Sequence, residues 1–197
     1  KRILELVYRI NPGATFINIS SMSMLKTQDT YLQAEDMTDY AFSKYIAEQY
    51  CLRHPLKKLS NVRFSTLFYE DPVRDGLSKL AFDGIRTNKM KVYNNGEAKR
   101  DFIPMEIAVK YLYKVSQQTE PPRKLNIASS DPLSFNHFSN ILQFHDPSLV
   151  VENVSAEVIE VLHVFSKDDI ERLGIIKFNI DDAFNNYIAK LSEGTNI

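Results

Sequence analysis

The segment TDYAFSKYIAEQY, residues 38–50, is the helix around which the rest of the fold is predicted to form. Tyr40 and Lys44 are four residues apart, so in a helix they share one face. A cation held beside a phenol favours the phenolate, which makes Tyr40 a candidate general acid/base. The spacing alone is weak in a chain with 10 tyrosines. The alternative is an ordinary surface helix whose tyrosine packs and whose lysine is solvated.

The composition describes a soluble globular chain of one domain or a little more, because 44% of its 197 residues are hydrophobic and 25% are charged. The net charge of -1 offers no basic field for nucleic acid or an anionic membrane surface. No apolar run is long enough to cross a bilayer, and no signal peptide is evident. We therefore expect a cytoplasmic protein with no nucleic-acid or membrane partner.

The single cysteine, Cys51, excludes an internal disulfide and favours a reducing compartment. The four histidines have no zinc-like spacing to it. We expect no metal site.

A strand–helix–strand unit surrounds the Tyr40 helix. Residues 14–19 are predicted to form a strand that places Ser20 and Ser21 at its carboxyl end, and residues 61–68 the next strand. A helix between two such strands is a parallel crossover, and ligands of open α/β sheets bind at the carboxyl ends of the strands. A helix over residues 1–10, with Ile3, Leu6, Val7 and Ile10 on one face, precedes this unit and lacks an N-cap residue.

Shorter elements follow. Helices are expected over residues 77–85, 104–115 and 134–142, from a cap-like start at residues 166–169 to a stop at Gly174, and in a final segment through Leu191. The expected strands cover 91–93, 125–128 and 157–165. The fold class is α/β: the C-terminal part of a doubly wound Rossmann-like parallel sheet, plus a smaller mixed α/β substrate-binding region. Residues 1–70 are assigned to the Rossmann-like domain and residues 71–197 to the substrate region, with some elements packing back on the sheet.

Five segments resemble, in order and spacing, the extended short-chain dehydrogenase/reductases of the NAD-dependent epimerase/dehydratase family, which act on nucleotide sugars. They are Ile19-Ser20-Ser21, Tyr40-x-x-x-Lys44, Arg63-Phe64-Ser65-Thr66, Arg100-Asp101-Phe102-Ile103 and LNIASS at residues 125–130. The order of the segments is the specific part, and it favours the functional interpretation of Tyr40 and Lys44.

The resemblance implies a role for each matched residue, with NAD or NADP as the cofactor. Tyr40 would exchange a proton with a sugar hydroxyl, Lys44 would hydrogen-bond the nicotinamide ribose, and Ser21 would hold the reacting sugar oxygen. Phe64 and Ser65 would line the nicotinamide side. Thr66 and Arg100 would contact the nucleoside-diphosphate sugar, with Arg100 on the diphosphate. Without the motif, Arg100 would be assigned to an ion pair with Asp101 or another acid. The family also implies a possible homodimer.

Several positions depart from the family. Thr66 stands where an asparagine is usual, Leu25-Lys26 where Tyr-Gly commonly closes the serine loop, and PMEI at residues 104–107 where YVDD is usual. The six glycines are at residues 13, 76, 84, 96, 174 and 194, too far apart for a Gly-rich pyrophosphate turn. We therefore expect the chain to be the C-terminal portion of such an enzyme, inactive by itself.

Three classes of function stay open. The first is a nucleotide-sugar epimerase or 4-ketoreductase, the second a binding module without turnover, and the third a structural fragment stable only in an oligomer. Within the enzyme class, family members that eliminate water resemble one another in an Asp-Glu pair after the serine, whereas this chain has Met22-Ser23-Met24. Because neither methionine can move a proton, 4,6-dehydration is the least expected activity.

Overall fold

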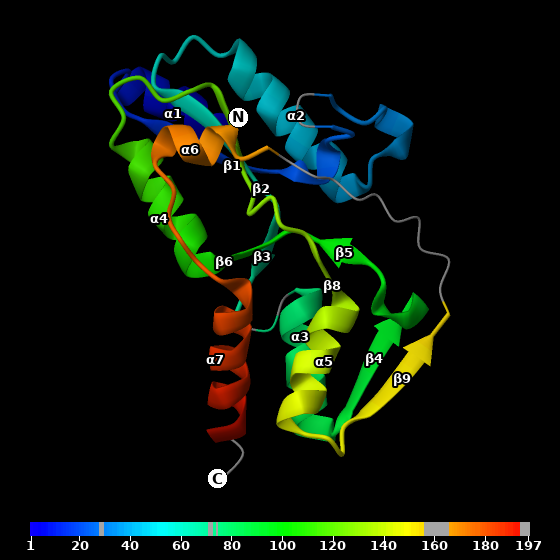
Figure 1. Ribbon diagram of the computed structural model, residues 1–197. Helices are drawn as coiled ribbons and strands as arrows, with labels where there is room; N and C mark the ends of the chain where they lie inside the picture. The colour runs from blue at the N-terminus through cyan, green and yellow to red at the C-terminus, as the bar shows by residue number, and fades with distance from the viewer. Residues whose placement is uncertain (28–29, 71–72, 74, 156–165, 194–197) are drawn as a thin grey trace. The chain divides into compact units, whose positions relative to one another are not determined.

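The computed structural model describes residues 1–27, 30–70, 73, 75–155 and 166–193 (Figure 1). The chain divides into two compact units, each made of segments that are distant in the sequence. The first unit comprises Lys1–Ser65, Glu106–Ser130 and Val164–Ile176, and the second comprises Thr66–Met105, Asp131–His163 and Lys177–Ile197. Assigning the cofactor to one part of the chain and the sugar to the other stays a prediction.

The first unit contains a parallel three-stranded sheet with the strand order β1-β2-β7. The strands are β1 (Phe16–Ser21), β2 (Leu59–Phe64) and β7 (Lys124–Ile127). Helix α2 (Asp39–Arg53) connects β1 to β2, which confirms the parallel crossover. Every residue of β2 is buried, as the central strand of a covered parallel sheet requires.

Helix α1 (Arg2–Ile10) forms as expected, but its inward face was predicted wrongly. Ile3 and Ile10 are 71% and 74% exposed, whereas Leu4 is only 2% exposed. Leu4 is buried because it packs with Cys51, Leu56 and Leu59 beneath the helix, and Val7 lies against that cluster. Periodicity identified the helix, but it could not choose between two neighbouring apolar stripes.

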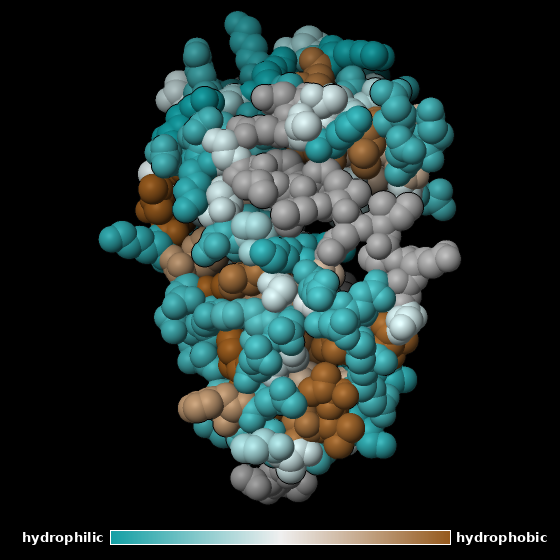
Figure 2. Space-filling model, turned by 45° about the vertical axis from the view of Figure 1, so that its right-hand side comes forward, coloured by the Kyte–Doolittle hydropathy of each residue, from teal (hydrophilic) through white to brown (hydrophobic). Residues whose placement is uncertain are grey.

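Figure 2 shows apolar side chains at the surface in separate patches among hydrophilic ones.

The described residues of the first unit also form two 3-10 turns and two further α-helices. They are the 3-10 turns η1 (Met22–Met24) and η2 (Ala34–Asp36), helix α6 (Asp168–Leu173), and α4 (Met105–Ser116) apart from its first residue. Along α4, Ile107, Ala108, Tyr111 and Val115 are buried.

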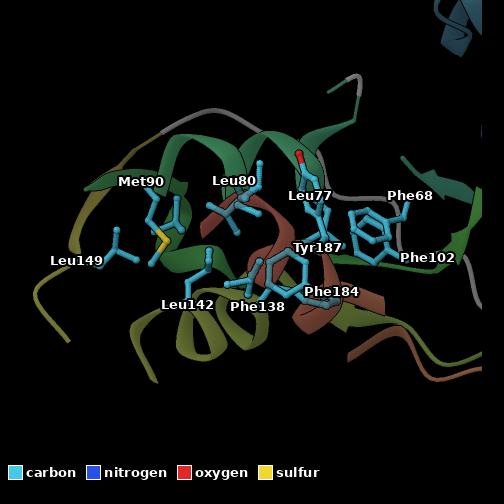
Figure 3. Packing of buried hydrophobic residues seen from close by; sticks show 14 residues of the cluster. Phe68, Leu77, Leu80, Met90, Phe102, Phe138, Leu142, Leu149, Phe184 and Tyr187 are labelled. Atoms are coloured by element: carbon cyan, nitrogen blue, oxygen red, sulfur yellow. The ribbon is translucent and has the colours of Figure 1, made fainter. Parts of the chain in front are cut away.

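The described residues of the second unit form three two-stranded sheets and three α-helices. Strands β3 (Thr66–Phe68) and β6 (Phe102–Pro104) are parallel, as are β4 (Lys89–Tyr93) and β9 (Val150–Val154), and β5 (Lys99–Arg100) is antiparallel to β8 (Leu133–Ser134). The helices are α3 (Gly76–Thr87), α5 (Phe135–His145) and α7 (Ile180–Glu193), with the turn η3 (Asn94–Gly96). Their apolar faces meet in one core (Figure 3). Phe138 is central, with ring centroids 5.4 Å from Phe102 and 5.0 Å from Phe184.

Two expected boundaries differ from the structure, and a third expectation is not tested. The strand expected over residues 61–68 is two strands, because pairing changes at Ser65: β2 pairs with β1 and β7, whereas β3 pairs with β6 in the second unit. Pro104 ends β6 instead of starting the following helix. The strand expected over residues 157–165 lies outside the described residues.

Gly96 supports a testable stability prediction. Its φ of +67° is left-handed, and a Cβ there would lie 2.8 Å from the backbone nitrogen of Asn136. Because neither backbone can move away easily, Gly96→Ala is expected to lower the free energy of unfolding by about 1–3 kcal/mol. Gly84→Ala is the matched control, since its nearest neighbour is a leucine methyl at 3.6 Å. Gly84 lies within α3, where alanine is expected to raise the free energy of unfolding by about 0.5–1 kcal/mol. Urea unfolding of both variants measures the difference, and equal midpoints would contradict it.

Candidate active site

The start of α2 carries the Tyr40–Lys44 pair. Thr38 Oγ1 caps the helix by accepting a hydrogen bond from Ala41 N at 3.2 Å. Tyr40 is 57% exposed in the first turn. Lys44 Nζ lies 5.6 Å from the centroid of the Tyr40 ring and donates to the carbonyl of Ile19 at 3.0 Å. The lysine is thus bound to the sheet and not only to solvent, and the pair lies at the carboxyl end of β1.

Ser21 ends β1 at the same edge. Its Oγ accepts a hydrogen bond from Ser23 N at 3.2 Å and lies 3.0 Å from Ser23 Oγ. Met22 and Met24 flank Ser23 and are almost fully buried, with Ala41 of α2 in the same cluster. The methionines therefore anchor residues 20–24, here called the serine turn, against the helix that carries Tyr40.

Phe64 and Ser65 end the neighbouring strand. Phe64 is the register partner of Ser21 in the parallel pair, and only 3% of its surface is exposed. Ser65 N donates to Ile127 O at 3.1 Å, which continues the pairing with β7. Among the described residues the buried Ser65 Oγ has no hydrogen-bond partner. An unpaired buried hydroxyl calls for an explanation, and a bound ligand would provide one.

Thr66 and Arg100 belong to the second unit. Thr66 N donates to Asp101 O at 3.0 Å, and Arg100 Nη1 donates to Lys99 O at 2.9 Å. Arg100 lines a pocket of about 870 Å³ that lies entirely within this unit. The other basic side chains on the pocket are Lys79, Lys89 and Lys91, and its apolar and aromatic side chains are Leu80, Val92, Tyr93, Ala98 and Phe135.

The structure therefore brings five of the expected site residues together in the first unit and leaves two in the second. The five are Ser21, Tyr40, Lys44, Phe64 and Ser65. Their roles stay predictions. Among the described residues no helix could span a bilayer, and no group of three potential metal ligands occurs.

A buried ion pair beneath this site was missed by the sequence analysis. Glu48 of α2 is fully buried and Arg63 of β2 is 1% exposed. Arg63 Nε lies 3.1 Å and 3.0 Å from the two Glu48 oxygens, and Arg63 Nη2 also binds the carboxylate. The available signal was a charged residue, Arg63, among the apolar residues of a predicted strand, because a charge that is buried there needs a buried partner.

Tyr31, which is half-buried, also contacts this ion pair. Its hydroxyl donates to Glu48 Oε1 at 2.7 Å and accepts from Arg63 Nη2 at 2.8 Å. Burial, and then the hydrogen bond and charge of Glu48, raise the pKa of Tyr31 to about 12. This phenol stays protonated near neutral pH. Burial acts to lower the pKa of Arg63, but the hydrogen bond and charge of Glu48 prevail and raise it. Both groups thus keep fixed protonation states.

Comparison with known sequences identifies the family. Residues 1–128 match the sequence profile of the NAD-dependent epimerase/dehydratase family. The chain belongs to this family. A search of curated protein sequences gave no match.

Solved structures share the fold at low sequence identity. The NAD-dependent NDP-hexosamine 5,6-dehydratase TunA of tunicamycin biosynthesis has a TM-score of 0.78 at 19% identity over 98% of this chain. An epimerase from Methanothermobacter thermautotrophicus has a TM-score of 0.80 at 16% identity, and the UDP-glucose 4-epimerase of Thermotoga maritima, solved with UDP-glucose, 0.79 at 13%, each over 98% of this chain. This chain spans 67%, 63% and 68% of the three proteins, respectively.

The expected placement within the family was wrong. The profile matches residues 1–128, the N-terminal Rossmann-like part of this chain, and this overturns the expectation of a C-terminal portion. That expectation used an uncapped first helix and the absence of a Gly-rich turn. Both describe what the chain lacks, and neither identifies which part of the family fold the residues present form. The α/β class with a parallel Rossmann-like sheet is confirmed.

Proposed function

We propose that the protein is a nucleotide-sugar epimerase or 4-ketoreductase that uses NAD or NADP. The observation that carries the proposal is the position of Lys44, whose ammonium contacts both the Tyr40 ring and the carbonyl end of β1. That arrangement places a phenol, a cation and the Ser21 hydroxyl at the edge of a parallel sheet where ligands bind. These are the groups needed to move one proton to or from a sugar hydroxyl.

Each residue has a chemical task in the proposal. Ser21 Oγ would hold the reacting sugar oxygen, and Tyr40 Oη would take or return its proton. Lys44 would stabilise the negative charge that develops on the phenolate oxygen. Phe64 excludes water from the strand end because its ring is buried.

The nicotinamide end of a dinucleotide fits the described residues. An ammonium has three N–H donors, and Ile19 O takes one of them, so Lys44 could also hold ribose hydroxyls. The unpaired Ser65 Oγ offers a further polar contact beside Phe64. When bound, the cofactor supplies the hydride acceptor or donor. No Gly-rich turn follows β1, β2 or β7, so the fit concerns the nicotinamide end.

The residues after Ser21 favour hydride exchange at one carbon over elimination of water. Met22 and Met24 are buried in the core, and Ser23 Oγ is engaged with Ser21 Oγ. No carboxyl is available in this turn to protonate a departing hydroxyl. We therefore propose epimerisation or keto reduction instead of 4,6-dehydration.

The pocket of the second unit is proposed to hold the nucleoside diphosphate. Its aromatic and apolar side chains suit a base, and Arg100 offers a forked, permanently charged donor to a diphosphate. Arg100→Ala is expected to weaken binding of UDP or a UDP-sugar about tenfold to a hundredfold, the effect of losing a charged hydrogen bond. Isothermal titration calorimetry measures this without turnover.

Arg86→Ala is the matched control for Arg100→Ala. Arg86 lies in the same unit, does not line the pocket and stacks over Phe82. Its removal should leave nucleotide binding unchanged. Equal affinities of the two variants would contradict the role of Arg100.

A panel of nucleoside-diphosphate sugars with NAD(H) or NADP(H) tests the reaction itself. The expected products are a C4 epimer or the alcohol formed from a 4-keto sugar. A 4-keto-6-deoxy product from an unmodified hexose nucleotide would overturn the choice of reaction. Binding of nucleotide sugars without conversion would favour the binding-module alternative.

A further inference from the structure

Helix α2 is tied to the end of β1 by two side chains that are one turn apart. Lys44 Nζ donates to Ile19 O at 3.0 Å, and Glu48 Oε2 accepts from Ser20 Oγ at 3.0 Å. The two contacted residues are consecutive and lead directly into Ser21. The spacing between Tyr40 and Ser21 therefore depends on how Glu48 is held.

Glu48 is also held by Arg63. Arg63 lies in β2, and its Nη1 also donates to Asn126 Oδ1 of β7 at 3.3 Å. One guanidinium thus links the helix to two strands. Because the group is buried, its electrostatic interactions are not weakened by water. A fixed fork of donors allows little lateral movement of the carboxylate.

Tyr31 closes this group from the loop that follows the serine turn. Tyr31 pairs with Leu25 as an isolated antiparallel bridge, and Leu32 N donates to Met24 O at 3.0 Å. The guanidinium carbon of Arg63 lies 5.3 Å from the Tyr31 ring centroid. Tyr31 therefore connects the backbone that follows Met24 to the Glu48–Arg63 pair.

We infer that Tyr31, Glu48 and Arg63 form a positioning group that fixes the serine turn of residues 20–24 relative to the α2 face bearing Tyr40 and Lys44. Tyr31 and Glu48 act through Ser20 and the turn, and neither touches the groups proposed to react. The kinetic consequence rests on the proposed function, whereas the structural consequence does not.

Tyr31→Phe is the first test, because it removes one hydroxyl and keeps the ring that packs on Tyr45. The amides of residues 20–24 are expected to exchange with solvent about tenfold faster, as loss of a hydrogen bond to a charged group predicts. Ser20→Ala removes the hydroxyl that donates to Glu48 Oε2 and should speed exchange at the same amides. NMR measures the exchange at single amides in the protein without substrate.

Tyr111→Phe is the matched control. The Tyr111 hydroxyl accepts a hydrogen bond from Ile176 N at 3.0 Å in the same unit, and the residue is buried. This variant should leave exchange at residues 20–24 unchanged. If Tyr31→Phe and Ser20→Ala also leave it unchanged, the inference is overturned.

The kinetic test separates this inference from the proposed function. In a protein that converts a nucleotide sugar, Tyr31→Phe should lower kcat about tenfold, the cost of a displaced catalytic group, with an unchanged KM for the sugar. If the unmodified protein shows no turnover while Tyr31→Phe still speeds amide exchange at residues 20–24, that result would overturn the proposed function and support the positioning group. An unchanged kcat in an active protein would overturn the inference.

Discussion

Replacing Tyr40 by phenylalanine is expected to reduce turnover of a nucleotide sugar by about a hundredfold to ten-thousandfold, the usual contribution of an acid/base. The phenol is the group proposed to exchange the sugar proton, and phenylalanine cannot exchange a proton. Little else should change, because the side chain is 57% exposed at the start of α2 and its loss leaves no buried partner unpaired. The thermal midpoint and the affinity for the nucleotide sugar should therefore stay as in the unmodified protein.

Tyr113→Phe provides the control for this result. Tyr113 is 66% exposed on α4 of the same unit and has no place in the proposed site. Steady-state rates of the two variants on the same sugar, with calorimetric affinities, separate chemistry from binding. Near-normal turnover by Tyr40→Phe would rule out the proposed acid/base.

Much of the local fold was predictable because its signals are local. The apolar segment before the Tyr40 helix predicted β1, and the segment over residues 38–50 predicted α2, both close to their observed bounds. Hydrogen bonding and strand alternation act over a few residues, so a short stretch of sequence specifies them. The change of partner at Ser65 depends on which distant strand pairs next, and sequence alone does not contain that information.

The placement of the candidate site residues was predictable in part for the same reason. Tyr40 and Lys44 lie on one helix, and Ser21 and Phe64 end adjacent strands, so pattern and order sufficed. The group formed by Tyr31, Glu48 and Arg63 joins residues 15, 17 and 32 positions apart, from a loop, a helix and a strand. A charge within an apolar strand predicts that a partner exists, but only the packed structure identifies it.

Breaking the Glu48–Arg63 pair is expected to have the largest effect on stability. Glu48→Leu leaves the guanidinium of Arg63 buried without its carboxylate, because both side chains are at most 1% exposed. Removing one partner of a buried pair costs about 3–5 kcal/mol, a large part of the stability of most domains. Urea unfolding followed by circular dichroism measures the loss. The exposed pair of Lys79 and Asp83, 2.9 Å apart on α3, is the control, and Asp83→Ala should cost about 0.5 kcal/mol or less.

The double variant Glu48→Leu/Arg63→Met decides why the single variant is unstable. If the cost arises from an unpaired buried charge, removing that charge should restore much of the lost stability, since apolar replacements of buried ion pairs are often neutral. If the pair instead supplies the stability by its own attraction, the double variant should remain as unstable as Glu48→Leu. We expect recovery of the unfolding midpoint without recovery of slow amide exchange at residues 20–24, because leucine and methionine can fill the space but cannot hold Ser20 Oγ. Slow exchange in a stable double variant would show that packing alone fixes the serine turn.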